Sequence, residues 1–286
     1  MHRHLAEVCF SGGRSRAGSV TGQSDGEREK CEATHVDGDS YDDDNHIDAE
    51  RAAKNVRHFQ GSGLKSPTLS DLILTFMFRL SFFTGGIAQT NGWLLETDSA
   101  AVVFDAPEGM ADWLASRDPV RASALVLTHQ HFDHVLDAAR IRAAYGCPVF
   151  AFAPFSRDLT LERLWGAVTG SSLAVEAFEV DEVLEGRDAV TIGGLDWQVL
   201  HIPGHSPDSI CLHQAALRIV FGGDVLFLDG IGRTDFPGGS TEMLLSGIEA
   251  RLLNLPDDTR VFPGHGDATT IGRERLENPF LQDGGW

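Results

Sequence analysis

The sequence predicts an α+β domain built as a four-layer αββα sandwich, preceded by a disordered N-terminal tail. Two observations predict the sandwich: from residue 76 onward short apolar runs typical of strands alternate with turns, and helix-like stretches follow each set of strands. A third predicts the tail, because residues 1–70 are rich in Gly, Ser, Asp and Arg and lack sustained apolar periodicity. We therefore expect residues 1–70 to be a disordered extension and residues 71–286 to form one folded domain.

The first half of the domain has the pattern of one sheet and its helical cover. Apolar or alternating runs predict strands at Phe76–Phe83, Asn91–Leu95, Ala101–Asp105, Ala124–Thr128 and Pro148–Phe152. Helical periodicity is found at Met110–Arg117 and at Asp133–Tyr145, where Gly146 is a stop signal. We expect residues 155–175 to form a helix and a loop that overhang the functional site.

The second half repeats the order of strands followed by a helix. Residues 179–227 have the pattern of several strands separated by Gly and Asp turns. Thr241–Leu253 is amphipathic, and we interpret its apolar stripe as core packing rather than as a cofactor site. Strands, helices, and then strands and helices again suit two sheets between two helical layers.

Charge and hydropathy limit the partners. The chain carries a formal net charge of −19; residues 1–75 hold 13 acidic and 9 basic side chains, so residues 76–286 hold 29 and 14, a net charge of −15. An acidic body repels phosphate backbones, so we expect no nucleic-acid partner. The apolar stretch Asp71–Phe83 contains Arg79 and is too short to span a bilayer, so we expect no membrane partner. A small-molecule substrate is the expectation, with the oligomeric state left open.

Cysteine usage favours a cytoplasmic protein. The four cysteines are Cys9, Cys31, Cys147 and Cys211. They show no paired spacing, which is typical of a reducing compartment. An organelle is the alternative, because the first twenty residues contain several Arg and Ser with only Glu7 acidic, as in a transit peptide.

Residues 128–134, Thr-His-Gln-His-Phe-Asp-His, place four potential metal ligands within six positions: His129, His131, Asp133 and His134. Imidazole nitrogens and carboxylate oxygens are ligands that zinc and similar ions prefer. Residues two apart in an extended segment point to the same side, so His129 and His131 can grip one ion. A helix starting near Asp133 would turn Asp133 and His134 to the other side of the same pocket. Asp and His also serve as caps at strand-to-helix turns, but the density of ligands here favours metal binding over that interpretation.

Three later segments each place a candidate ligand at the end of an apolar run, beside glycines that let the backbone bend. They are His205 in Pro-Gly-His, Asp224 in Gly-Gly-Asp and His265 in Pro-Gly-His. One such residue alone is more often structural. Together with residues 128–134, the three predict a metal-binding constellation.

This set of motifs resembles the metallo-β-lactamase superfamily, which implies an αββα sandwich with a one- or two-metal centre at one edge. Gly232–Gly239, Pro263–Gly272 and Asn278–Leu281 further resemble the short bacterial glyoxalase II-like branch, of hydroxyacylglutathione hydrolase type. The resemblance covers about residues 77–281. It implies that residues 71–286 are a metallo-β-lactamase-like catalytic domain.

The resemblance also implies roles for the ligands. His129, His131 and His205 would hold the first metal, Asp133, His134 and His265 the second, and Asp224 would bridge the two. The expected cofactors are two divalent ions, zinc first, with iron or manganese as alternatives. Asp133 and Asp224 would be catalytic. Arg233 would bind a substrate carboxylate or, equally, brace its turn by pairing with Asp235.

The implied activity is hydrolysis of a small acyl thioester, S-lactoylglutathione or similar, by attack of a metal-bridging hydroxide. Alternatives are a mononuclear-iron persulfide dioxygenase, whose members share Gly-Arg-Thr-Asp-Phe, a lactonase or other hydrolase of this fold, and a non-catalytic binding protein. Glyoxalase II enzymes continue into a helical extension whose basic residues hold glutathione, whereas here five residues follow Leu281 and no lysine follows Lys65. We therefore expect thiol recognition to differ from theirs.

Overall fold

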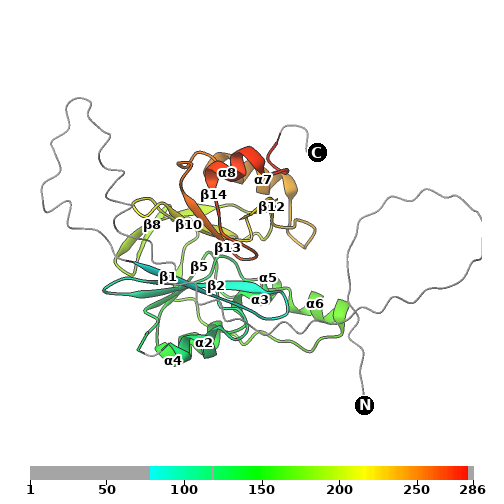
Figure 1. Cartoon of the computed structure of the whole chain (residues 1–286). Helices are drawn as coiled ribbons and strands as arrows, with labels where there is room; N and C mark the ends of the chain where they lie inside the picture. Colours follow the sequence, from blue (N-terminus) through cyan, green and yellow to red (C-terminus); the bar gives the residue numbers. More distant parts are fainter. Residues whose placement is uncertain (1–77, 118, 283–286) are drawn as a thin grey trace, which may run out of the picture. The chain divides into compact units, whose positions relative to one another are not determined.

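The structure, a computed structural model, describes residues 78–117 and 119–282. By internal contacts the chain divides into Met1–Leu64 and Lys65–Trp286, and the described residues all belong to the second unit. The predicted disordered extension, residues 1–70, lies outside the described residues. Within them, α2 and α4 cover one outer face, α7 and α8 cover the opposite one, and two sheets lie between (Figure 1). The predicted αββα sandwich is confirmed.

The first sheet has the strand order β1-β2-β3-β4-β5-β6. Its strands are β1 Arg79–Gly85, β2 Thr90–Glu96, β3 Ala101–Phe104, β4 Ala124–Val126, β5 Val149–Ala151 and β6 Glu182–Val183. The helices of this half are α2 Met110–Ser116, α3 Phe132–Val135, α4 Ala138–Tyr145, α5 Arg157–Thr160 and α6 Glu162–Thr169. Strands β3 to β6 run parallel to one another, so the loop after β4, which carries residues 128–134, leaves the carboxyl end of the sheet.

The second sheet has the order β14-β13-β10-β9-β8-β7. Its strands are β7 Ala189–Ile192, β8 Leu195–His201, β9 Ile210–Gln214, β10 Ile219–Gly223, β13 Arg260–Pro263 and β14 Thr269–Thr270. A separate hairpin pairs β11 Leu226–Phe227 with β12 Gly230–Ile231. The outer helices are α7 Thr241–Arg251 and α8 Ile271–Glu277. Because β10 and β13 are parallel, Asp224 and His265 emerge at the same edge.

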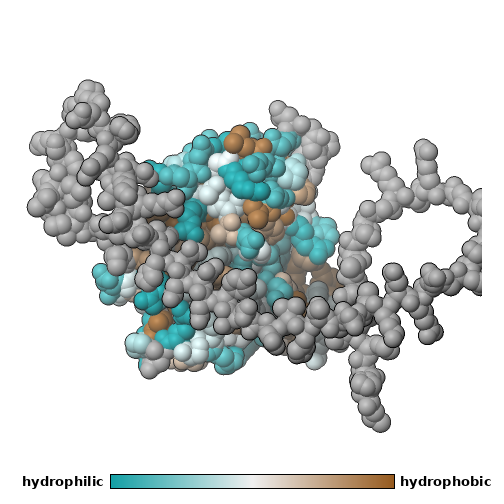
Figure 2. Space-filling model, viewed as in Figure 1, coloured by the Kyte–Doolittle hydropathy of each residue, from teal (hydrophilic) through white to brown (hydrophobic). Residues whose placement is uncertain are grey.

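Three apolar clusters hold the layers together. One lies between the first sheet and its helices, with Leu125 and Ile141 buried in it. The second fills the space between the sheets, where Phe104 and Phe221 stack at 3.7 Å between ring centroids. The third joins the second sheet to α7 through Leu244 and Ile248, which confirms the predicted core stripe at these positions, whereas Met243 of the same apolar stripe is 50% exposed. The surface over α7 and α8 is mostly hydrophilic with small apolar patches (Figure 2).

Two predicted elements need correction. The strand predicted at Phe76–Phe83 begins at Arg79 and continues to Gly85, while residues 76–77 lie outside the described part. The helix predicted over Asp133–Tyr145 is two helices, α3 and α4, broken at Leu136 and Asp137. The Asp137 carboxylate accepts hydrogen bonds from the backbone N–H groups of Gly109 and Ala111 at the start of α2. The interruption also has a backbone cause: the Asp137 N–H donates to the Ala106 carbonyl at 2.9 Å and the Ala106 N–H donates to the His134 carbonyl at 2.7 Å, so these groups are not available for hydrogen bonds within one continuous helix.

The two sheets are joined at the edge where the candidate ligands lie. The Ile210 N–H of the second sheet donates to the Thr128 carbonyl at 2.9 Å, and the Asn91 N–H of the first donates to the Gly264 carbonyl at 2.7 Å. The Trp93 indole N–H adds a bond to the Pro263 carbonyl at 3.0 Å. No helix in residues 78–117 and 119–282 combines the length and apolar character needed to cross a membrane.

Candidate metal centre

All seven side chains that the sequence predicts as ligands converge at this edge. They form three overlapping groups, in each of which the ligand atoms lie within 4.8 Å of one another: His129, His131 and His205; His129, His134 and Asp224; Asp133, His134 and His265. The segment after β4 supplies four of them, two from the loop (His129 and His131) and two from α3 (Asp133 and His134), and the loops after β8, β10 and β13 supply one each. We call His129, His131 and His205 the three-histidine half, and Asp133, His134, Asp224 and His265 the carboxylate-rich half.

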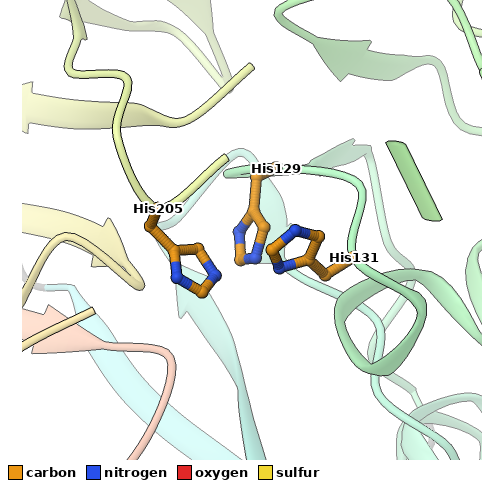
Figure 3. A group of neighbouring side chains, drawn as sticks. All are labelled: His129, His131 and His205. Carbon is orange, nitrogen blue, oxygen red and sulfur yellow. The ribbon is translucent and has the colours of Figure 1, made fainter. Parts of the chain in front are cut away.

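The three-histidine half is a compact set of buried imidazoles. Their ring centroids lie 4.5–4.9 Å apart, and Figure 3 shows the rings turned toward one another. His205 Nδ1 lies 2.8 Å from the Arg233 carbonyl and donates to it, which leaves Nε2 facing the cluster as a lone-pair donor. The Nε2 atoms of His129 and His205 are buried without a hydrogen-bond partner.

Burial keeps these imidazoles neutral. It lowers the pKa of His129 well below its ordinary value, and the neighbouring histidines, His134 foremost, lower it further. Burial and then His205 lower the pKa of His131 to about 3. The pKa of His205 is lowered for the same first reason, burial. Neutral imidazole is the form that binds a metal, so this half carries no proton that an ion must displace near pH 7.

In the carboxylate-rich half, imidazoles and carboxylates alternate. His134 Nε2 lies 3.3 Å from Asp224 Oδ1 and 3.6 Å from Asp133 Oδ2. His265 Nε2 lies 3.3 Å from Asp224 Oδ2 and 3.4 Å from Asp133 Oδ2. Asp224 Oδ2 is also 3.4 Å from His205 Nε2, so this carboxylate faces both halves.

Opposite charges shift the pKa values of this half apart. Burial disfavours each charged form, but the carboxylates of Asp224 and Asp133 outweigh it and raise the pKa of His134 well above its ordinary value and that of His265 to about 10. Burial likewise acts to raise the pKa of Asp133, but His134 and His265 lower it to about 2. The pKa of Asp224 is lowered well below its ordinary value by the same two histidines, against burial.

Two residues that orient the ligands were missed in the sequence. Asp105, which follows β3, accepts hydrogen bonds from the Thr128 N–H and hydroxyl, both at 2.8 Å, and from His134 Nδ1 at 2.9 Å. Thr90 at the start of β2 donates to Asp133 Oδ2 at 2.7 Å. Metal-binding histidines commonly donate their second nitrogen to such a carboxylate. The signal for Asp105 was present: like Asp224, it is a carboxylate directly after a fully apolar strand.

Gly264 explains the glycine before His265. A Cβ at this position would lie 2.3 Å from Asp224 Oδ1 and 2.5 Å from His134 Cε1. Both atoms belong to the cluster, so any side chain would displace two donors. The Pro-Gly-His motif thus reflects close approach of the backbone to the site.

The donor set fits a divalent metal site. Buried polar atoms are normally hydrogen bonded, and an unsatisfied group is costly. Among the described residues, seven buried side-chain polar atoms have no hydrogen-bond partner, and four of them belong to this one cluster: His129 Nε2, His134 Nε2, His205 Nε2 and Asp224 Oδ1. Mixed imidazole and carboxylate ligands of this kind suit zinc, iron or manganese.

Arg233 lies at the rim of the centre. Its guanidinium donates two hydrogen bonds to Asp235, both at 2.7 Å, and stacks over the Phe236 ring at 4.0 Å. Phe236 in turn meets His131 edge-on, with 5.7 Å between ring centroids. The bracing pair with Asp235 that the sequence suggested is therefore present. Binding of a substrate carboxylate by Arg233 stays a prediction.

The predicted overhang is a pair of short helices, α5 and α6. The Trp165 ring of α6 lies 5.4 Å from that of Phe132, the residue between His131 and Asp133. Gln130, between the first two histidines, is wholly buried and donates to the carbonyls of Ala153 and Pro154 at 3.0 and 3.1 Å. The intervening residues of the motif thus anchor the segment that leads to α5 and α6.

Comparison with known proteins identifies the family. The sequence model of the metallo-beta-lactamase superfamily matches residues 85–265. The hydroxyacylglutathione hydrolase GloC of Haemophilus influenzae is 35% identical over 197 residues, which cover 68% of this chain and 93% of GloC.

Solved structures give the same result. BLEG-1 B3 metallo-beta-lactamase superposes with a TM-score of 0.63 at 36% identity, covering 71% of this chain and 100% of its own. TTHA1623 in a di-iron-bound form superposes with a TM-score of 0.61 at 34% identity, covering 70% of this chain and 100% of its own.

Proposed function

The chain belongs to the metallo-β-lactamase superfamily and has the fold of its metal-dependent hydrolases. We propose that it hydrolyses a small acyl thioester, S-lactoylglutathione or a similar compound. The observation that carries the proposal is the convergence of seven donor side chains, four of whose atoms are buried without a hydrogen-bond partner. The likeness to GloC supports the thioester as the substrate class.

Within this proposal the two halves hold one ion each. His129, His131 and His205 would hold the first, Asp133, His134 and His265 would hold the second, and Asp224, whose carboxylate faces both halves, would be shared between them. Divalent ions bound in such a pair lower the pKa of water to about 7 and stabilise the charge that develops on an attacked carbonyl oxygen. Zinc is the first candidate, and the di-iron form of TTHA1623 makes iron a candidate as well.

The protein's own residues then orient the reaction. Asp133, whose pKa is held at about 2, stays a carboxylate at neutral pH and accepts a hydrogen bond from the attacking water. Thr90 fixes that carboxylate by donating to Oδ2 at 2.7 Å. Asp105 fixes the His134 ring by accepting a hydrogen bond from its Nδ1 at 2.9 Å. Such preorganised polar groups contribute because they need not rearrange when the carbonyl is attacked.

Arg233 is proposed to bind a substrate carboxylate. Its pairing with Asp235 leaves the guanidinium exposed at the rim, close to Phe236 and the three-histidine half. Under this proposal, Arg233→Ala raises KM for a carboxylate-bearing thioester by roughly tenfold and leaves kcat unchanged. Under the bracing interpretation, Asp235→Ala has the same effect as Arg233→Ala, because either change breaks the pair.

The decisive experiment is hydrolysis of S-lactoylglutathione at neutral pH by protein loaded with zinc, iron or manganese, with metal-stripped protein as control. We expect turnover that depends on the metal. Cleavage of a lactone or another ester without any thioester turnover would contradict the thioester assignment and keep the protein among the hydrolases.

A persulfide dioxygenase is the second candidate, because the segment Gly232–Phe236 resembles that class as well. Metal content and oxygen uptake separate the two. One iron per chain together with oxygen consumption on glutathione persulfide would favour the dioxygenase, whereas two ions per chain and oxygen-independent release of thiol would favour the hydrolase.

A further inference from the structure

The hairpin formed by β11 and β12, residues 226–231, lies next to Asp224 at both of its ends. It starts two residues after this carboxylate and pairs Leu226 with Ile231 and Phe227 with Gly230. Where it returns, a Cβ at Gly232 would lie only 1.9 Å from the Asp224 carbonyl oxygen, so the chain passes directly against the backbone of Asp224. The base of the hairpin is therefore fixed to the metal centre.

The hairpin presents an apolar wall beside His265. The Phe227 ring meets the His265 ring edge-on, with 6.1 Å between centroids and 85° between planes. Phe227 is partly exposed and Leu228 is 36% exposed. His265 is the most exposed of the seven candidate ligands, with 28% of its side chain accessible. The Phe227 ring therefore borders the exposed side of His265.

The tip of the hairpin is held from α8, more than forty residues away in the sequence. Glu274 is fully buried, and its two carboxylate oxygens are fully used. Oε2 accepts the Asp229 N–H at 2.9 Å and the Asn278 side-chain amide at 2.9 Å. Oε1 accepts the Thr269 hydroxyl and an Arg273 N–H group.

Two neighbours of Glu274 complete this attachment. Asn278 also donates to the Gly230 carbonyl at 3.0 Å, and Arg273 donates to both carboxylate oxygens of Asp229 at 2.8 and 3.1 Å. Asp229 itself has a φ of +58°, a left-handed conformation that such contacts must maintain in a residue other than glycine. Two segments that the sequence analysis singled out, Pro263–Gly272 and Asn278–Leu281, flank α8 and supply Thr269 and Asn278 to this attachment.

We propose that Glu274 is a positioning residue that holds the 226–231 hairpin over His265, and that Phe227 thereby becomes a specificity residue for the apolar part of an acyl group. The assignment of that apolar part to an acyl group rests on the proposed function. The attachment of the hairpin does not, because it is built from hydrogen bonds within the chain.

The first test measures the attachment by amide hydrogen exchange in metal-loaded protein. Glu274→Gln keeps the size of the side chain but replaces one accepting oxygen with an NH2 group, which cannot accept the N–H hydrogen bonds made to that oxygen. The backbone amides of residues 226–231 are therefore expected to exchange at least roughly tenfold faster. Glu277→Gln is the matched control, because this exposed carboxylate of the same helix contacts only Arg273 among the residues above. Unchanged exchange in Glu274→Gln overturns the proposal. Asn278→Ala, which removes the bond to Gly230, tests the same point where Glu274→Gln fails to fold.

The second test measures selectivity through binding of two carboxylic acids, acetate and phenylacetate, to metal-loaded protein by calorimetry. Wild type is expected to prefer phenylacetate. Phe227→Ala is expected to weaken phenylacetate roughly tenfold and acetate less than about twofold, since it removes apolar contact area only. Phe227→Leu restores part of the preference, and Phe82→Ala, at an exposed aromatic on β1, changes neither affinity.

The outcomes separate this proposal from the proposed function. Glu274→Gln is expected to lower the phenylacetate-to-acetate preference as Phe227→Ala does, with metal content unchanged. If Glu274 only stabilises the fold, Glu274→Gln lowers Tm and leaves the phenylacetate-to-acetate preference intact, and this result overturns the proposal. A wild-type protein without that preference overturns it as well. Failure of thioester hydrolysis removes the proposed function and leaves both of these measurements to decide the hairpin.

Discussion

The two halves of the candidate metal centre achieve the same density of ligands by opposite electrostatic means. In the three-histidine half, burial and repulsion between the imidazoles lower their pKa values, which favours the neutral form. Two of these imidazoles, His129 and His205, also have a buried Nε2 atom without a hydrogen-bond partner. In the carboxylate-rich half, Asp133 and Asp224 raise the pKa values of His134 and His265, so the same type of side chain is protonated.

The difference shows what each half requires of an ion. An ion entering the three-histidine half displaces no proton at neutral pH, whereas one entering the carboxylate-rich half must release the protons of His134 and His265. We therefore expect the first half to bind its ion at lower pH than the second. Four measurements test this difference between the two halves.

Removal of the residue that faces both halves should have the largest effect. Asp224→Ala takes away the carboxylate that lies 3.3–3.4 Å from His134, His205 and His265. We expect activity to fall more than roughly a thousandfold, because under the proposed function this carboxylate would serve both ions and support several kcal/mol of transition-state stabilisation. Steady-state kinetics and metal analysis measure this. Asp258→Ala, at an exposed carboxylate paired with Arg218, is the control and should retain activity and metal.

Titration of His265 should produce the next effect. Because its pKa is raised from 6.5 to about 10, its contribution to stability is fully present below pH 6.5 and is lost as the pH rises through about 10. A rise of the pKa from 6.5 to about 10 corresponds to about 4.8 kcal/mol, which solvent screening of this partly exposed side chain reduces. The free energy of unfolding of metal-stripped wild type should thus lose roughly 3 kcal/mol relative to His265→Gln across this window. Denaturant unfolding at several pH values measures it. A constant difference between the two proteins would show that the carboxylate-rich half holds no extra proton.

Loss of the orienting carboxylate should have an intermediate effect confined to one half. Asp105→Ala leaves His134 Nδ1 and the Thr128 hydroxyl without their acceptor. We expect metal affinity of the carboxylate-rich half to fall about 10–100-fold, the usual range for such partners of a metal-binding histidine. Competition with a chelator measures it. An equal loss from both halves would mean that Asp105 supports the whole edge of the sandwich instead.

The smallest effect is expected at Thr90. Thr90→Val removes one hydrogen bond to Asp133 Oδ2 and keeps the shape of the side chain. A bond to a charged group contributes about 1.5–3 kcal/mol, but Asp133 retains His134 and His265 nearby, so we expect only a several-fold loss of kcat. Kinetics on the same thioester measure the change. Thr84→Val is the control, because Thr84 bonds to Asn91 rather than to a ligand.

Much of the site was accessible from the sequence, because ligand chemistry is concentrated in short motifs. His129, His131, Asp133 and His134 stand together, and His205, Asp224 and His265 each follow an apolar run beside glycine. Asp105 also follows an apolar run, but it has no neighbouring glycine and no cluster of histidines draws attention to it. Thr90 has no local signal, since its role depends on a bond across 43 positions of the chain.

The layered fold, the seven candidate ligands and the acidic body follow from the sequence alone, because hydrophobic periodicity and side-chain chemistry are properties of neighbouring residues. The tertiary structure was needed to show how burial and neighbouring charges shift the pKa values of the histidines, where the predicted helix is interrupted, and which groups Glu274 contacts. Each of these depends on burial and on the distance between charges from different strands and helices. Such distances are set by how the two sheets pack, which local sequence does not encode.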